Sequence, residues 1–272
     1  MSDTTPAGST RARRPAAPPA VVALLAGVVV ALSLPPWGFW PLSFVGVVLF
    51  DLALGPSPSR RKAAGLAFLF ALAWTAIGMA WMWFLTVPGY VFSACLFGAF
   101  HAVAGAVAPT GRWRVIGRPA AHTLVEAIRL GFPFGGVPLA TLGIAQAGGP
   151  LLGVARVGGV VLLTWIVFQV GFAVLPIATS ERSRPAMIGV GLAALSVAVS
   201  VVAPTGRDTG ESLTIAAVQG GGEQGTTALD VPSSLVTQRL LEATRTIEPS
   251  DDLDVVMWPE NGIDVDGEPF DG

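Results

Sequence analysis

Long apolar stretches alternate with short polar segments along the chain up to about residue 203. The first stretch begins at Ala16 and ends at Leu34. Six more follow it, at 39–54, 63–86, 90–109, 119–131, 151–178 and 186–203. A helix needs ~20 apolar residues to cross a 30 Å hydrocarbon core, and several of these stretches reach or approach that length. The pattern predicts a polytopic α-helical membrane domain of about seven spans over residues 20–203.

A cleavable signal peptide is the competing interpretation of the first stretch. No clear A-x-A cleavage site follows it, and further apolar stretches do. We therefore interpret the first stretch as an uncleaved span.

The pattern changes after residue 204. Leu213–Val218 predicts a buried strand, which the flexible run 219–222 ends. Four apolar residues then recur at the spacing of an amphipathic helix: Val236, Leu240, Ala243 and Ile247. Residues 253–257 predict a second strand. The region 213–272 therefore opens with a β-α-β unit.

The composition excludes an ordinary soluble protein. Of the 272 residues, 52% are hydrophobic and 12% are charged, about half of the roughly 25% charge content typical of soluble domains. Residues 1–205 carry 13 Lys and Arg against 4 Asp and Glu, a net charge of +9. Residues 206–272 carry 3 against 14, a net charge of −11. A linker at 204–212 therefore separates a lipid-solvated region from a water-solvated one.

Basic residues fall in alternate loops between the predicted spans. We expect the Ser-, Thr-, Ala- and Pro-rich residues 1–19 to form a disordered cytoplasmic tail. This tail and three loops carry eleven cations: Arg11, Arg13, Arg14, Arg60, Arg61, Lys62, Arg112, Arg114, Arg118, Arg182 and Arg184. The loops around 35–40, 86–89 and 131–150 carry none. By the positive-inside rule, seven spans then place the N-terminus in the cytoplasm and residues 204–272 outside it.

Two residue pairs are candidates for lipid binding. Glu126 and Arg129 are spaced i, i+3 within one predicted span, so they can meet on one helix face. Ionisable groups at this depth face protein or a water-filled cavity, so the pair indicates either a network that joins helices or a site for a lipid headgroup. Trp81 and Trp83 fall near the outer end of a span. They indicate either an interfacial aromatic belt or a wall through which lipid reaches an outward-facing site.

Few residues offer metal or thiol chemistry. Cys95 is the single cysteine, and its apolar neighbours predict a small packing residue. His101 and His122 are the only histidines, and neither belongs to a metal-binding motif. We therefore expect no metal and no cofactor, and no nucleic acid is expected among the partners.

Glu260 is the candidate catalytic residue. It follows an apolar strand, Trp258 and Pro259, at the carboxyl end of the predicted β-α-β unit. Ligands and chemistry usually lie at that end of an open α/β sheet, and a carboxylate there can act as a general base. A surface glutamate at the end of a strand is the alternative that position alone leaves open.

Seven segments, in a fixed order, carry a further pattern: LSLPPWGFWPLSFVG (32–46), GMAWMWFL (78–85), VEAIRLGFPFGG (125–136), LGIAQAGGPLL (142–152), RVGGVVLLTWIV (156–167), AAVQGG (216–221) and DVVMWPENG (254–262). Together they resemble the apolipoprotein N-acyltransferase family, membrane-embedded members of the nitrilase superfamily. The Trp-Pro-Glu tripeptide after AAVQGG is the most specific of these matches.

The resemblance implies a two-step acyl transfer by a Glu-Lys-Cys triad outside a bacterial cytoplasmic membrane. A Cys thiol takes an acyl chain from a phospholipid as a thioester, and the α-amine of a diacylglyceryl-modified lipoprotein cysteine then accepts it. Glu260 matches the family's general base, whereas no Lys or Cys follows it as far as Gly272. We therefore expect residues 213–272 to be the start of an incomplete αββα nitrilase-like domain, and the chain to be an inactive N-terminal portion.

The alternative function is a non-catalytic membrane scaffold. Acyltransferase-like membrane domains resemble, in some bacteria, partners that anchor a polyprenyl-phosphate mannosyltransferase. The two functions differ in their partners, because the enzyme needs a phospholipid donor, a lipoprotein acceptor and the lipid bilayer.

Overall fold

The computed structural model describes residues 17–133, 135–179, 184–207, 209–221, 231–248, 250 and 252–259. The chain divides into two compact units. One unit comprises Met1–Gly78 and Ala94–Val202, and the other comprises Met79–Ser93 and Ala203–Gly272. The first is called the helical unit below, and the second is called the smaller unit.

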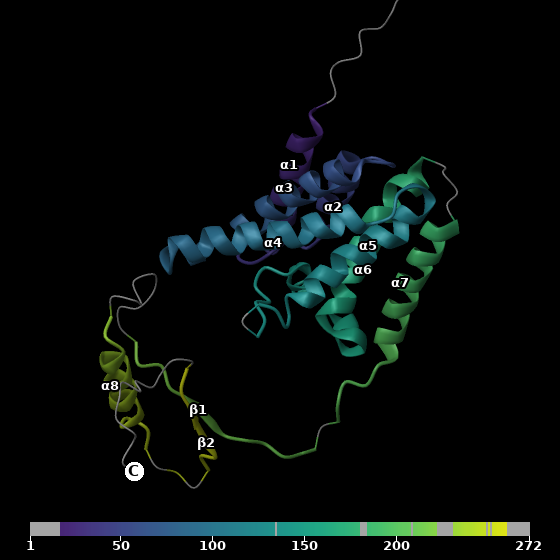
Figure 1. Cartoon of the computed structure of the whole chain (residues 1–272). Helices are drawn as coiled ribbons and strands as arrows, with labels where there is room; N and C mark the ends of the chain where they lie inside the picture. The colour runs from purple at the N-terminus through teal and green to yellow at the C-terminus, as the bar shows by residue number, and fades with distance from the viewer. Residues whose placement is uncertain are drawn as a thin grey trace, which may run out of the picture. The chain divides into compact units, whose positions relative to one another are not determined.

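The part of the chain that the structure describes is mostly helical, and a helix occurs at or near each predicted apolar stretch (Figure 1). The bounds are α1 Pro19–Ala31, α2 Pro41–Leu54, α3 Arg60–Gly78, α4 Val87–Val107, α5 Arg114–Ile128, α6 Ala155–Ala178 and α7 Arg184–Val202. Both α1 and α2 begin with a proline, which fits the first turn because its missing N–H would have no partner there.

Three segments within the described residues are long and apolar enough to cross a membrane. They are Val87–Val107, Leu152–Ala178 and Arg184–Val202. Helices α1 and α2 are apolar but shorter. The chain is therefore a helical membrane protein by length and composition.

Two expected boundaries are wrong. The stretch 63–86 is not one helix, because α3 ends at Gly78 and a 3-10 turn, η1, follows at Ala80–Phe84. Arg114 and Arg118 were expected in a loop but lie inside α5, where both are buried. Arg118 tolerates this position because its guanidinium bonds the Asp51 carboxylate and the carbonyl of Gly55.

Cys95 also differs from expectation. It was expected to pack inside the protein, but its side chain is exposed on the surface of α4. Phe97, two residues away, faces the core instead.

Glycine contacts bring the helix backbones close together. Gly27 of α1 lies against the carbonyl of Phe70 in α3, and Gly46 of α2 lies against α1. A Cβ at Gly105 of α4 would lie 2.7 Å from the carbonyl oxygen of Ala63 in α3. Small residues permit this approach, which is typical of helix packing in membranes.

Aromatic rings fill the space between the helices. Phe50 of α2 stacks on Phe70 of α3 with centroids 4.2 Å apart, and its edge meets Phe172 of α6. Helix α6 packs against α2, α5 and α7 and is the central element of the unit. It is interrupted at Gly158–Gly159, where Gly159 adopts a positive φ of 64°.

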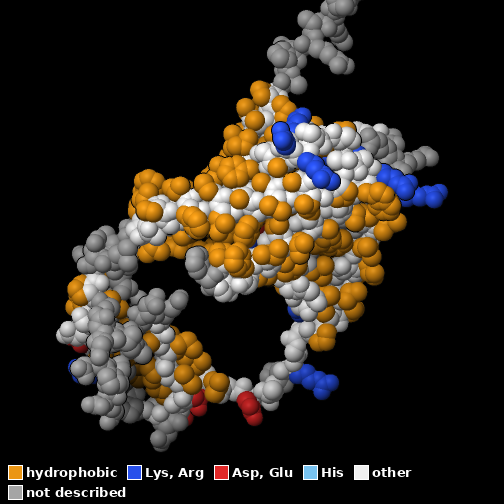
Figure 2. Space-filling model, in the orientation of Figure 1, with side chains coloured by type: hydrophobic (Ala, Val, Ile, Leu, Met, Phe, Trp, Pro, Cys, Tyr) orange, Lys and Arg blue, Asp and Glu red, His pale blue; other side chains and the backbone are white. Residues whose placement is uncertain are grey.

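The loops that carry arginines lie together at the helix ends, and a loop without Lys or Arg contacts the start of α2. The N–H of Gly111 donates to the carbonyl of Pro56 over 3.3 Å, which joins two loops that carry arginines. Gln146, from a loop without Lys or Arg, donates to Ser43 near the start of α2 over 2.9 Å. In Figure 2, Lys and Arg side chains gather along one edge of this unit, while hydrophobic side chains cover the visible flank.

The smaller unit contains the predicted β-α-β element. Strands β1 (Ile215–Ala217) and β2 (Val255–Met257) pair in parallel, with Ile215 opposite Val255. Helix α8 (Ser233–Thr244) lies between them in sequence. The expectation that Leu213–Val218 is a buried strand is wrong for most of its length. Leu213 and Ile215 are exposed, and only Val218 at its end is a buried hydrophobic residue. A parallel sheet needs a layer on each face, and the described residues of 203–259 contain a single helix.

Candidate functional site

The structure describes four of the five predicted site residues and brings two of them together. Glu126 and Arg129 meet near the end of α5. Trp81 and Trp83 lie in η1, each about half exposed, and Trp83 meets Tyr90 edge to face. Glu260 lies outside the described residues, just beyond the segment that follows β2.

Glu126 and Arg129 form a buried ion pair. Nη1 of Arg129 donates to Oε1 of Glu126 over 2.5 Å, and the side chains are 0% and 3% exposed, respectively. One helix turn separates the residues, which accounts for the contact. The sequence-based expectation that they share a face is therefore confirmed.

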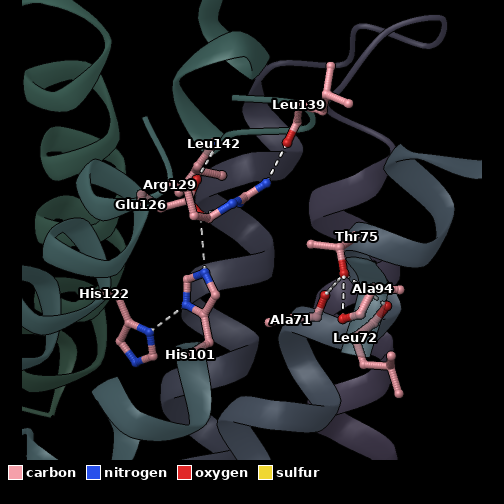
Figure 3. Close-up of polar contacts among 10 residues, drawn as sticks. All are labelled: Ala71, Leu72, Thr75, Ala94, His101, His122, Glu126, Arg129, Leu139 and Leu142. Carbon is pink, nitrogen blue, oxygen red and sulfur yellow. Dashed lines mark hydrogen bonds and ion pairs between the residues drawn. The ribbon is translucent and has the colours of Figure 1, made fainter. Parts of the chain in front are cut away.

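The same two side chains hold the loop that follows α5 (Figure 3). Nη2 of Arg129 donates to the carbonyl of Leu139, and the N–H of Leu142 donates to Oε2 of Glu126 over 3.1 Å. The N–H of Val137 adds a bond to the carbonyl of Arg129. Leu142 begins a 3-10 turn, η3 (Leu142–Gln146), that packs on α6. The ion pair therefore ties the end of α5 to residues 137–146.

A histidine pair extends the cluster towards the centre of the helical unit. Nε2 of His101 in α4 lies 3.2 Å from Oε1 of Glu126. Nδ1 of His101 lies 2.9 Å from Nδ1 of His122 in α5, and the two rings stack at an interplanar angle of 18°. Both histidines are fully buried. We call these four residues, Glu126, Arg129, His101 and His122, the polar cluster.

Aromatic side chains surround the polar cluster. The guanidinium of Arg129 lies 3.8 Å from the centroid of the Phe97 ring, a cation–π contact. Trp74 packs near His101, and Phe168 and Phe172 pack on His122. Polar interactions are stronger in such apolar surroundings, and an unpaired charge there is costly.

The geometry gives the ion pair a clear structural role. Both oxygens of Glu126 accept bonds from protein donors, and Arg129 donates to protein acceptors on two sides. These bonds connect α4, α5 and the 137–146 loop, as expected of a network that joins helices. A role in binding a lipid headgroup stays a prediction.

Sequence reasoning did not pair the histidines with Glu126. A signal was present within α5, because His122, Glu126 and Arg129 are spaced i, i+4 and i+7 on one helix face. Nothing in the sequence placed His101 of α4 against that face. Among the described residues, no group of three or more His, Cys, Asp or Glu side chains is arranged to hold a metal ion.

Comparison with known proteins gives one family. The profile of the apolipoprotein N-acyltransferase N-terminal domain matches residues 26–173, which is more than half of the chain. Three similar proteins are each named apolipoprotein N-acyltransferase. The one from Pseudomonas syringae pv. tomato is 30% identical over 95% of this chain and 54% of its own length. Those from Azotobacter vinelandii and Vibrio cholerae are each 26% identical, over 93% and 89% of this chain and 52% and 50% of their own lengths.

The chain spans about half the length of the curated relatives it matches. The match to the family profile begins in α1 and ends in α6, so it contains the whole polar cluster. The similar proteins extend the match over nearly all of the chain. The chain therefore belongs to the apolipoprotein N-acyltransferase family, of which it carries the N-terminal domain.

Proposed function

We propose that this protein acts in lipoprotein N-acylation, moving an acyl chain from a phospholipid to the α-amine of a diacylglyceryl-modified lipoprotein cysteine. The match of the family profile to residues 26–173 carries this proposal. The similar proteins support it, since their names state N-acyl transfer to an apolipoprotein.

The reaction proceeds in two steps, with a thioester as the intermediate. A Cys thiolate attacks the acyl ester carbonyl of the phospholipid, and the lysophospholipid leaves with the proton that the general base took from the thiol. The lipoprotein amine then attacks the thioester, and the thiol recovers a proton as the amide forms. Glu260 is the general base in this scheme. Its family partners, Lys and Cys, have no counterpart after it in residues 261–272.

The proposed topology uses all seven helices α1–α7 as spans. The arginine-bearing loops then lie in the cytoplasm, and residues 204–272 lie outside the membrane. The hydrogen bond between the loops at Pro56 and Gly111 supports this arrangement, because both loops must lie on the same side. The parallel pairing of β1 and β2 supports a nitrilase-like α/β domain beginning at residue 213.

The lipid-binding part of the proposal concerns two pairs of residues, one pair in each unit. Trp81 and Trp83 form an apolar wall past which the acyl chain of the donor moves, and their exposure supports this role. Glu126 and Arg129 act within the helical unit, where they fix the 137–146 loop. A headgroup would reach these two residues only if that loop opened.

The test is thioester formation by the product of the full reading frame, isolated in phospholipid. The parent is expected to carry a hydroxylamine-sensitive acyl chain, and Glu260→Gln is expected to lose it. Glu248→Gln is the matched control, because Glu248 is an exposed glutamate of the same unit. Acylation of the Glu260→Gln variant at the parental rate would contradict the role of Glu260. A parent that never acylates would favour the scaffold.

A further inference from the structure

A cavity reaches from the surface of the helical unit to the buried His122. Arg60, Pro109 and Thr110 line its outer part and are exposed, whereas Arg118 and His122 line its inner part and are buried. About 20 Å³ of the cavity is open to the centres of water molecules. A single water needs ~10–15 Å³ by this measure, so the cavity has room for one or two.

One ring nitrogen of His122 has no hydrogen-bond partner among the described residues. Its Nδ1 meets His101, while Nε2 is buried without a protein partner. Figure 3 shows this second nitrogen pointing away from His101. A buried polar atom left unpaired costs about 1–3 kcal/mol, so a partner for Nε2 in the cavity would stabilise the fold.

The contacts of the polar cluster determine which kind of partner fits. Oε1 of Glu126 can only accept, so Nε2 of His101 carries a proton. A neutral His101 then has a bare Nδ1, and the 2.9 Å contact requires the proton to lie on Nδ1 of His122. A neutral His122 is therefore left with a lone pair at Nε2, which needs a hydrogen-bond donor.

Charge balance favours neutral histidines. Glu126 offsets Arg129 on one side of the pair, and Asp51 offsets Arg118 on the other. Phe50, Phe168 and Phe172 provide no further compensation. One extra proton on the pair would add an unpaired buried charge, which costs several kcal/mol.

We propose that this cavity is a water-binding site in which an ordered water donates a hydrogen bond to Nε2 of His122. Water can pair with both polar groups that line the inner part of the cavity. It donates to the unprotonated Nε2 of His122 and accepts from the guanidinium N–H groups of Arg118. A small anion without a proton cannot donate to the lone pair of Nε2, and a metal cation would be repelled by the positive charge of Arg118.

The bound water also opens a route for proton exchange between the polar cluster and solvent at the arginine-bearing loops. The water takes up a proton from solvent as it gives one of its own to Nε2 of His122, so one O–H bond forms and one breaks. The proton on Nδ1 of His122 then moves to Nδ1 of His101. One N–H bond forms on each histidine and one N–H bond of His122 breaks. Because an extra proton on the pair is costly, it stays on His101 only transiently and leaves by the reverse of these steps.

The test is nitrogen NMR of the full chain in lipid nanodiscs, labelled at histidine and purified with a tag that contains no histidine. The chain has two histidines, so the spectrum contains two ring systems, which His101→Gln and His122→Gln assign. We expect His122 to be protonated at Nδ1 and bare at Nε2, with magnetisation transfer from water to His122. The opposite tautomer of His122, or no transfer from water, would overturn the proposal.

Filling the cavity provides the matched comparison. Ala63 and Ala108 both line it, so Ala63→Leu and the milder Ala108→Val are expected to abolish the transfer from water to His122. Ala64→Leu adds the same volume as Ala63→Leu at a neighbouring position that does not line the cavity, and it should keep the signal. If Ala63→Leu does not fold, Ala108→Val decides the outcome. Undiminished transfer in a folded cavity-filling variant would overturn the proposal.

Discussion

The backbone N–H of Leu142 donates to the carboxylate of Glu126 across 16 residues of sequence. This bond joins the end of α5 to the start of a 3-10 turn, and Arg129 completes the connection by donating to the carbonyl of Leu139. A loop rich in Gly and Pro has little structure of its own. The buried ion pair is what fixes its position against the helices.

Removing Arg129 should destabilise the helical unit strongly. Arg129→Met leaves the Glu126 carboxylate buried without its cation, which costs about 3–5 kcal/mol. The double variant Glu126→Gln, Arg129→Met should lose less than the sum of the two single variants, since it removes both charges. Unfolding free energies in mixed detergent micelles measure this coupling. Arg61→Met, at an exposed arginine, serves as the control, and additive losses would contradict the coupling.

The contact between α3 and α4 predicts opposite outcomes for two glycines. A Cβ at Gly105 would lie 2.7 Å from the carbonyl oxygen of Ala63, so Gly105→Ala should cost about 1–3 kcal/mol through forced helix separation. A Cβ at Gly65 of α3 meets nothing within 4 Å, so Gly65→Ala should be neutral or stabilise by about 0.5–1 kcal/mol. The measurement is the melting temperature of each of the two variants in detergent, relative to the parent. Equal effects would show that the two helices do not pack as described.

The proposed topology predicts the sidedness of thiol labelling. In a Cys95→Ser background, Ser212→Cys should react with a membrane-impermeant maleimide added outside intact cells. Ser57→Cys, in the loop between α2 and α3, should react after the cells are opened and not before. Both positions are exposed, so accessibility to solvent does not bias the result. Labelling of Ser57→Cys from outside would refute the assigned orientation.

Replacing the tryptophans of η1 should weaken binding of the phospholipid donor. Trp81→Ala combined with Trp83→Ala should raise the KM for the phospholipid donor by about 5–30-fold, equivalent to ~1–2 kcal/mol of lost apolar contact, with a smaller change in kcat. Trp113→Ala is the control, because Trp113 is equally exposed but lies beside the arginine-bearing loop. Steady-state kinetics of the full reading frame's product provide the measurement. An equal effect of Trp113→Ala would indicate a general membrane anchor.

Much of the architecture could be predicted from the sequence. Apolar runs predicted the positions of α1 to α7, and the period of Val236, Leu240 and Ala243 predicted α8 between two parallel strands. Local patterns suffice for this, because helix formation and burial depend mainly on nearby residues. The burial of Arg114 and Arg118 was missed. Their charges suggested a loop, and the Asp51 that compensates Arg118 lies 67 residues away.

The sequence by itself determined that this is a helical membrane protein with an acidic α/β segment, since hydropathy and charge are properties of composition and order. It also determined that Glu126 and Arg129 lie on one face, because helix geometry relates residues three apart. Only the tertiary structure decided that His101 joins them and contacts His122, and that a cavity reaches His122. Those relationships depend on how α4 and α5 pack, and no local pattern encodes a contact between side chains 21 or 25 residues apart.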